Sequence, residues 1–156
     1  MIYLDHAATA PVPQPVAQAV YEVLAGQYGN PSAQYPLGLD MKKRTESWRA
    51  AVAAAMDCPP ERLYFTSCGT EGDNWALRAA AWQNRQMGRH IVTTAVEHSA
   101  VLECCKWLER DGCEVTCIAP DQDGHITAKQ VLEAVRPDTA LVSVMLVNNE
   151  LGTVYP

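Results

Sequence analysis

The chain has 156 residues, of which 48% are hydrophobic and 19% charged, a composition that is typical of one globular domain and excludes a disordered protein. The net charge is −6 and the basic residues are scattered, which argues against a nucleic-acid partner; no apolar run reaches the ~20 residues needed to cross a bilayer, so no membrane partner is expected either. The N-terminal segment has no basic head and no apolar signal core, so we expect a cytoplasmic protein.

The predicted elements follow an extended entry segment at residues 1–11. In chain order they are a helix at 14–27, a helix at 39–56, a strand at 63–66, a helix at 72–87, a strand at 90–94, a helix at 99–110, a strand at 113–119, a helix at 128–135 and a strand at 139–146. Within the second helix we expect these side chains to face inward: Met41, Trp48, Ala51, Val52 and Ala55. The later strands alternate with helices, and the last strand is a nearly continuous apolar run. The sequence therefore predicts an α/β fold with a three-layer, mostly parallel sheet.

The six cysteines contain no C-x-x-C pair, and in a chain without a leader they are expected to be thiols. Cys113 and Cys117 lie in a predicted strand, where four residues span ~13 Å, too far to share one metal ion. We therefore predict no metal site.

Polar residues follow three of the predicted strands, at the edge where ligands bind in open α/β sheets. The first loop, Ser67 to Glu71, suits a phosphate, because Gly69 allows close approach to the amides of a helix start and Thr70 adds a hydroxyl donor. The alternative is a simple cap, in which Ser67 or Thr70 only begins the helix. Neither G-x-x-x-x-G-K-[ST] nor G-x-G-x-x-G is present, which excludes those two nucleotide loops.

The second and third loops add an imidazole and a carboxamide. His98 precedes a helix and could stack on a flat ring or transfer a proton; the alternative is a capping or surface histidine. Glu97 is expected to be solvated or to cap. Asn149 can donate to a ring hydroxyl or a carboxylate; the alternative is an Asx-turn.

Five segments together resemble the cysteine desulfurases, pyridoxal-phosphate enzymes of the class V aminotransferase group. They are Tyr3 to Thr9, Tyr28 to Ser32, Phe65 to Glu71, Val96 to His98 and Val147 to Thr153. The resemblance implies the N-terminal part of the large domain of fold-type I pyridoxal enzymes, with residues 1–156 as one partial domain. It also implies roles: Gly69 and Thr70 would hold the cofactor phosphate, His98 would stack on the pyridine ring and transfer protons, and Asn149 would reach the phenolic oxygen or the substrate carboxylate.

The implied reaction takes sulfur from L-cysteine, releases alanine and leaves a persulfide on an enzyme cysteine. The implied partners are a second copy in a homodimer and a sulfur acceptor or iron–sulfur scaffold protein. Cys68 lies in the binding loop, but the family's sulfur carrier lies on a much later loop, so we do not assign that role to Cys68.

The cofactor chemistry also needs a lysine, and the lysines here all lie in predicted helices: Lys42, Lys43, Lys106 and Lys129. In the family, the lysine, its acidic partner and the persulfide cysteine come after the last residue of this sequence. We expect a fragment, one half of a split enzyme or a remnant. The alternatives are another class V enzyme, such as a selenocysteine lyase or an aminotransferase, and a non-catalytic α/β binding or scaffold protein.

Overall fold

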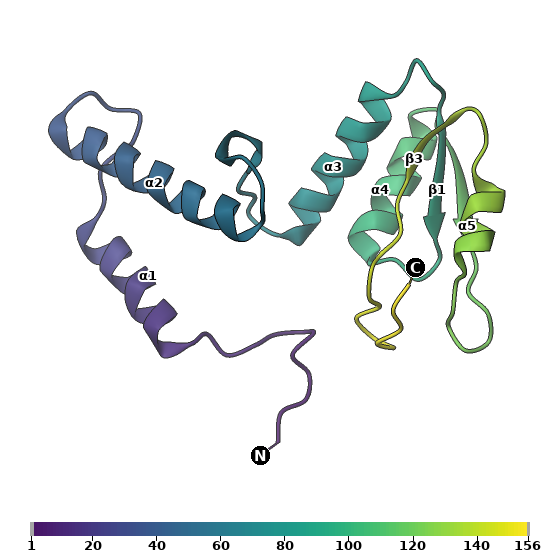
Figure 1. The fold of residues 1–156 in the computed structure, drawn as a ribbon, viewed down its shortest axis with the longest axis horizontal. Helices are drawn as coiled ribbons and strands as arrows, with labels where there is room; N and C mark the ends of the chain where they lie inside the picture. Colours follow the sequence, from purple (N-terminus) through teal and green to yellow (C-terminus); the bar gives the residue numbers. More distant parts are fainter. Residues whose placement is uncertain (1, 156) are drawn as a thin grey trace. The chain divides into compact units, whose positions relative to one another are not determined.

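A computed structural model describes residues 2–155 and divides the chain into two compact units, Met1–Phe65 and Thr66–Pro156. We call them the helical unit and the sheet unit (Figure 1). The assignment of residues 1–156 to a single partial domain stays a prediction. Among residues 2–155, no helix combines the length and the apolar composition that crossing a membrane requires.

The helical unit contains α1 (Gln14–Gly26), α2 (Pro36–Ala55) and the short 3-10 helix η1 (Pro60–Arg62). Both predicted helices are confirmed. Each has a proline in its first turn, where the missing N–H costs nothing and the fixed φ favours the helix. The second helix therefore begins at Pro36, three residues before the predicted start.

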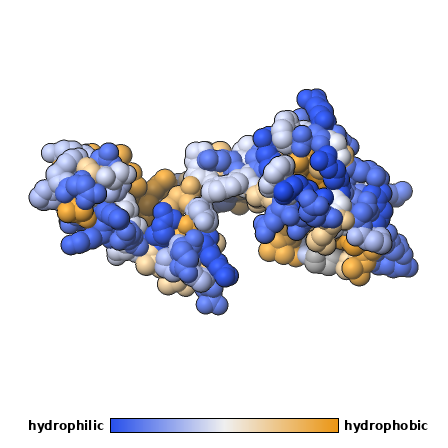
Figure 2. Space-filling model, turned by 90° about the horizontal axis from the view of Figure 1, so that it is seen from above, coloured by the Kyte–Doolittle hydropathy of each residue, from blue (hydrophilic) through white to orange (hydrophobic). Residues whose placement is uncertain are grey.

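The inward face predicted for α2 is only partly buried. Met41 is buried, but Trp48 is 41% exposed and Val52 is 40% exposed, and Ala51 and Ala55 are exposed as well. Within residues 2–65 the structure describes no strand, so this unit offers no sheet against which an apolar helix face could pack. Figure 2 shows hydrophobic residues, in orange, at the surface among hydrophilic ones in blue.

The strand predicted at residues 63–66 is wrong. No strand is assigned there, although these residues have strand-like side chains. The guanidinium of Arg49 donates to the carbonyl oxygen of Leu63 and lies over the ring of Phe65. A side chain of α2 thus satisfies a backbone group that a neighbouring strand would otherwise bind.

The sheet unit has three parallel strands in the order β2-β1-β3: β1 (His90–Thr94), β2 (Glu114–Ile118) and β3 (Thr139–Val142). The predicted parallel α/β fold is confirmed. The strand at 90–94 has the predicted bounds. The last strand ends at Val142 rather than at residue 146, because the amide of Met145 donates to the Glu97 carboxylate instead of continuing the ladder.

Helices cover both faces of this sheet. On one face lie α3 (Gly69–Gln83) and α4 (Ser99–Arg110), and their apolar side chains surround Ile91 of β1. The buried cluster on this face consists of Leu77, Ala81, Ile91, Val101, Cys104, Cys105 and Leu108. Leu141 of β3 packs against that cluster, whereas the next residue, Val142, borders the other face beside α5 (Ala128–Ala134). This alternation gives the predicted three layers.

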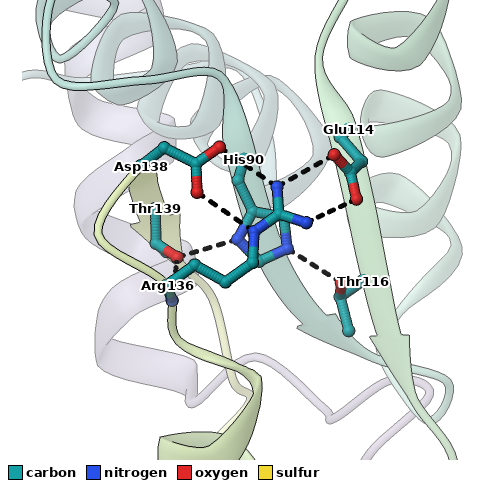
Figure 3. A network of polar contacts seen from close by, with 6 residues as sticks. All are labelled: His90, Glu114, Thr116, Arg136, Asp138 and Thr139. Carbon is teal, nitrogen blue, oxygen red and sulfur yellow. Dashed lines mark hydrogen bonds and ion pairs between the residues drawn. The ribbon is translucent and has the colours of Figure 1, made fainter.

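A polar network closes the edge of the sheet at which the strands begin, which we call the amino edge (Figure 3). Its members are His90, Glu114, Thr116, Arg136, Asp138 and Thr139. The two ring nitrogens of His90, which is 1% exposed, lie 2.7 Å from the Thr139 hydroxyl and 2.8 Å from the Thr116 hydroxyl. Arg136 binds both oxygens of Glu114 and both oxygens of Asp138, which ties the loop before β3 to β2.

Candidate functional site

A cavity of about 440 Å³ lies at the other edge of the sheet, where the strands end. We call this the carboxyl edge. The cavity is lined by residues 95–99, which follow β1, and by residues 148–151, which follow β3. His98 and Asn149, predicted from two loops 51 positions apart, both border it and are both exposed. The fold therefore brings these two predicted site residues together.

His98 caps helix α4. Its Nδ1 atom accepts a hydrogen bond of 3.1 Å from the amide of Ala100, so the capping alternative is confirmed as a structural role. Because Nδ1 is an acceptor, the neutral ring carries its proton on Nε2. The cap fixes the ring at the cavity and leaves one nitrogen for chemistry.

Asn149 is not the residue that makes the Asx-turn in this loop. The preceding residue, Asn148, accepts from the amides of Glu150 and Leu151 at 2.9 and 2.8 Å through its Oδ1 atom. Asn148 is 7% exposed, and its turn presents Asn149 at the cavity with an exposed side chain.

Gly69 and Thr70 form the first turn of α3, and neither is among the residues that line the cavity. They lie close to the start of α4, because the Asn74 amide donates both to the Thr70 carbonyl at 2.9 Å and to the Ala100 carbonyl at 3.4 Å. A Cβ atom on Gly69 would meet nothing within 4 Å, so this helix start is open. The alternative of a simple cap by Ser67 or Thr70 is wrong in detail: the N-cap residue is Cys68, without a side-chain cap, and α3 begins three residues earlier than predicted.

The start of α3 favours negative charge. Hydrogen bonding from the backbone of Glu71, then from the Ser67 hydroxyl, lowers the pKa of the exposed Cys68 thiol. The same turn lowers the pKa of Glu71, whose Oε2 accepts from the hydroxyl and the amide of Ser67 at 2.7 and 2.6 Å. Both shifts arise from N–H and O–H donors directed at an anion, as at helix N-termini generally.

Two buried side chains fasten the two loops of the cavity to each other. Glu97, only 8% exposed, accepts through Oε1 from the Thr94 hydroxyl at 3.0 Å and from the amide of Met145 at 2.7 Å. Asn148 donates from Nδ2 to the Val96 carbonyl at 3.0 Å. We call this pair the loop clasp. Burial raises the pKa of Glu97, against the opposing effect of these hydrogen bonds.

Sequence reasoning missed the clasp. It expected Glu97 to be solvated or to cap, which is wrong: Glu97 is buried, and one of its two partners is a backbone amide 48 residues away. No local pattern could have revealed that amide, because backbone amides are alike at all residues except proline and the sequence does not mark which one binds Glu97. The only sign of this contact in the sequence is the acidic residue that directly precedes His98.

The lysines lie in α2, α4 and α5, as predicted, and all are exposed. Two of them form ion pairs within their own helices: Lys106 with Glu103 at 2.6 Å and Lys129 with Glu133 at 3.8 Å. None of the four lines the cavity at the carboxyl edge.

Comparisons with known proteins agree on one family. The sequence matches the family described as "Aminotransferase class-V" over residues 2–156. A relative from Azotobacter vinelandii, "Cysteine desulfurase IscS", is 45% identical over 156 residues, which are 98% of this chain and 39% of that protein. The chain spans about two fifths of the length of such relatives.

Solved structures are similar as well. A "NIFS-LIKE PROTEIN" superimposes with a TM-score of 0.92 at 35% identity, covering 99% of this chain and 43% of that one. The structure titled "SspA in complex with cysteine" gives a TM-score of 0.89 at 34% identity, covering 99% and 44%. Residues 2–155 thus have the fold of the corresponding part of these proteins.

Proposed function

Because the chain belongs to the aminotransferase class-V family, we propose that it is the N-terminal part of a pyridoxal-phosphate-dependent cysteine desulfurase. The observation that carries the proposal is the cavity at the carboxyl edge, which is bordered by His98 and Asn149 together. The whole enzyme would transfer the sulfur of L-cysteine to a cysteine thiol of its own, which becomes a persulfide, and would release alanine. The solved complex of SspA with cysteine supports this choice of substrate.

The residues present fit pyridoxal phosphate. The cavity of about 440 Å³ lies within the ~300–1,000 Å³ typical of small-molecule sites. The start of α3 is open at Gly69, and hydrogen-bond donors there lower the pKa of Cys68, as donors that favour negative charge do. When bound, the cofactor supplies an electron sink for a carbanion at the substrate Cα.

Each residue of the chain has a distinct task in this proposal. The amides of Gly69 and Thr70, with the Thr70 hydroxyl, bind the phosphate and so orient the ring. His98, held through Nδ1 by its cap, places its ring against the pyridine and moves a proton at Nε2. The Asn149 carboxamide donates to the phenolic oxygen or the substrate carboxylate, and the loop clasp keeps it beside His98.

The exposed helical lysines give no candidate for covalent attachment of the cofactor. We therefore propose that this chain supplies the phosphate seat and the ring-binding residues, while the lysine and the persulfide cysteine come from sequence that it lacks. A homodimer and a sulfur-accepting or iron–sulfur scaffold partner belong to the same proposal for the whole enzyme.

Binding is tested by following the imidazole Hε1 resonance of His98 by NMR while the 156-residue chain is titrated with pyridoxal 5′-phosphate. We expect a saturable shift at His98 and at the Asn149 amide. Thr70→Val should weaken binding about tenfold or more, because a hydrogen bond to a charged group contributes roughly 1.5–3 kcal/mol. Thr45→Val, a matched change in α2, should have no effect. An equal response to pyridoxal without phosphate would contradict the proposed seat.

Two further readouts separate the desulfurase from its alternatives. Borohydride reduction with pyridoxal phosphate, followed by peptide mass mapping, should give no adduct concentrated on one lysine; a specific adduct on one of the four would overturn the assignment. Co-expression with a C-terminal portion from a desulfurase should restore alanine release from cysteine. A complemented complex that releases selenide from selenocysteine but no alanine from cysteine would favour the selenocysteine lyase, and an inactive complex would favour a scaffold.

A further inference from the structure

A second cavity, of about 200 Å³, lies in the sheet unit where α3 and α4 end, near the amino edge and so away from the candidate site. We call it the arginine–tryptophan pocket. The lining residues that carry the argument are Arg78, Trp82, Arg85, Arg89, Trp107 and Asp111. Both indoles reach the surface: Trp82 is 67% exposed and Trp107 is 42% exposed.

The arginines of this pocket are held in place before any partner arrives. The guanidinium of Arg78 lies 4.0 Å from the ring centre of Trp107, and that of Arg85 lies 4.0 Å from the ring centre of Trp82. Arg85 also donates to the Trp82 carbonyl at 2.7 Å, and Arg89 donates to the Asp111 carbonyl at 2.9 Å. Stacked and hydrogen-bonded side chains lose less rotamer freedom on binding than free ones do.

These guanidinium groups lack carboxylate partners. Among the ion pairs of residues 2–155, none involves Arg78, Arg85 or Arg89. By contrast, Arg136 in the amino-edge network is bound by both Glu114 and Asp138. A guanidinium has five N–H donors, so most of the donors around this pocket remain for an acceptor from outside. The charged residues of the lining are three arginines and one aspartate, Asp111, so the pocket is a local positive site in a chain of net charge −6.

We propose that the arginine–tryptophan pocket binds an acidic segment of a partner protein. A carboxylate of that segment forms a paired hydrogen bond with Arg85 or Arg89, and an adjacent apolar or aromatic side chain packs on the exposed indoles. The volume of about 200 Å³ is below the ~300–1,000 Å³ typical of small-molecule sites and suits one or two side chains. Tryptophan and arginine are also the residue types most enriched at binding hot spots. The proposal does not depend on the cofactor or on the desulfurase reaction.

The test uses the intact 156-residue chain and a fluorescein-labelled peptide of the sequence Glu-Asp-Glu-Phe-Asp-Glu-Glu. We expect saturable fluorescence anisotropy at low salt, and affinity that falls as salt rises. Replacing two of the three arginines, as Arg85→Gln with Arg89→Gln, should weaken binding at least tenfold. The matched control is Arg110→Gln in the last turn of α4, which removes a positive charge outside the pocket and should change affinity less than twofold. Far-UV circular dichroism verifies that each variant keeps its helices.

A variant in the aromatic part keeps the proposal testable if the double change unfolds the chain. Trp82→Ala removes the stacking surface of Arg85 at an exposed position and should lower the affinity for the peptide at least fivefold. Three results would overturn the proposal: no binding by the wild type, equal weakening by Arg110→Gln, or displacement of the peptide by inorganic triphosphate at the same concentration as by unlabelled peptide. Self-association that the double variant abolishes would assign the pocket to a second copy instead.

Discussion

At the amino edge of the sheet, the polar side chains satisfy one another: His90 binds two threonines, and Arg136 binds two carboxylates. At the carboxyl edge, several polar groups remain open to the solvent. His98 uses one nitrogen for its cap, Asn149 is exposed, and the start of α3 faces open space at Gly69. The two edges belong to the same three strands, so the difference does not come from the sheet.

The difference lies in what the buried groups do at each edge. At the amino edge, the side chains of the network bind one another, so their hydrogen-bonding groups are already used. At the carboxyl edge, the buried pair Glu97 and Asn148 satisfies backbone groups and thereby leaves its sequence neighbours, His98 and Asn149, free to face the cavity. The two side chains that border the cavity are thus positioned by the hydrogen bonds of the residues that precede them in the sequence, as in pre-organised sites generally.

The largest expected effect concerns the reactivity of cysteines. Hydrogen bonding at the start of α3 lowers the pKa of Cys68, whereas burial raises the pKa of Cys105 to about 11. Because the thiolate is the nucleophile and each pKa unit changes its fraction tenfold, Cys68 should react with iodoacetamide at pH 7 at least roughly a hundred times faster than Cys105. Mass spectrometry of peptides after timed labelling measures the ratio.

The same labelling compares the two edges directly. Cys113, which precedes β2 at the amino edge, has a pKa raised by burial and should be slower than Cys68. Inorganic phosphate should slow Cys68 alone if the helix start binds anions. Equal labelling rates at Cys68 and Cys113 would contradict the expected electrostatic difference between the two edges.

The second effect is on stability. Glu97→Ala leaves the amide of Met145 and the hydroxyl of Thr94 without their buried acceptor, so the free energy of unfolding should fall by roughly 1–3 kcal/mol. Urea denaturation measures this change. The lost clasp should also broaden the NMR resonances of His98 and Asn149.

Glu97→Gln is the matched control, since its amide oxygen can accept both hydrogen bonds. We expect this variant to keep most of the wild-type free energy of unfolding. Burial raises the folded-state pKa of Glu97, so wild-type stability from this group is greatest below about pH 4 and falls as the pH rises. Glutamine cannot ionise and should remove that fall. If Glu97→Ala is as stable as the wild type, the clasp does not hold the loops.

The smallest effect belongs to the exposed ion pairs of Arg136. Hydrogen bonds from Arg136 lower the pKa of both Glu114 and Asp138, so their stabilisation is present above the unfolded-state values near pH 4 and is lost as the pH falls through the folded-state values. Arg136→Gln should therefore lower the urea midpoint at pH 7 slightly, with the difference vanishing in acid. A gap between variant and wild type that is unchanged at pH 2 would show that the arginine acts by packing and not by charge.

Particular elements show how far the sequence predicts this fold. The strand at 90–94 and the helix at 99–110 have the predicted bounds, because β-branched residues, a helix cap and a terminating Gly112 at φ +89° are all local signals. Residues 63–66 also have side chains that favour a strand but form none, since a strand needs a partner as well. Composition cannot supply that partner.

The sequence by itself determined that strands and helices alternate from residue 90 on, and it singled out Thr70 at a helix start and His98 and Asn149 in the polar loops that follow two of the strands. These depend on side-chain type and on spacing along the chain. Only the tertiary structure decided that His98 and Asn149 border one cavity, that Cys68 rather than Ser67 is the N-cap of α3, and that Glu97 binds an amide 48 residues away. The physical reason is that backbone amides and carbonyls are identical at every residue, so which of them a side chain meets depends on how the chain packs.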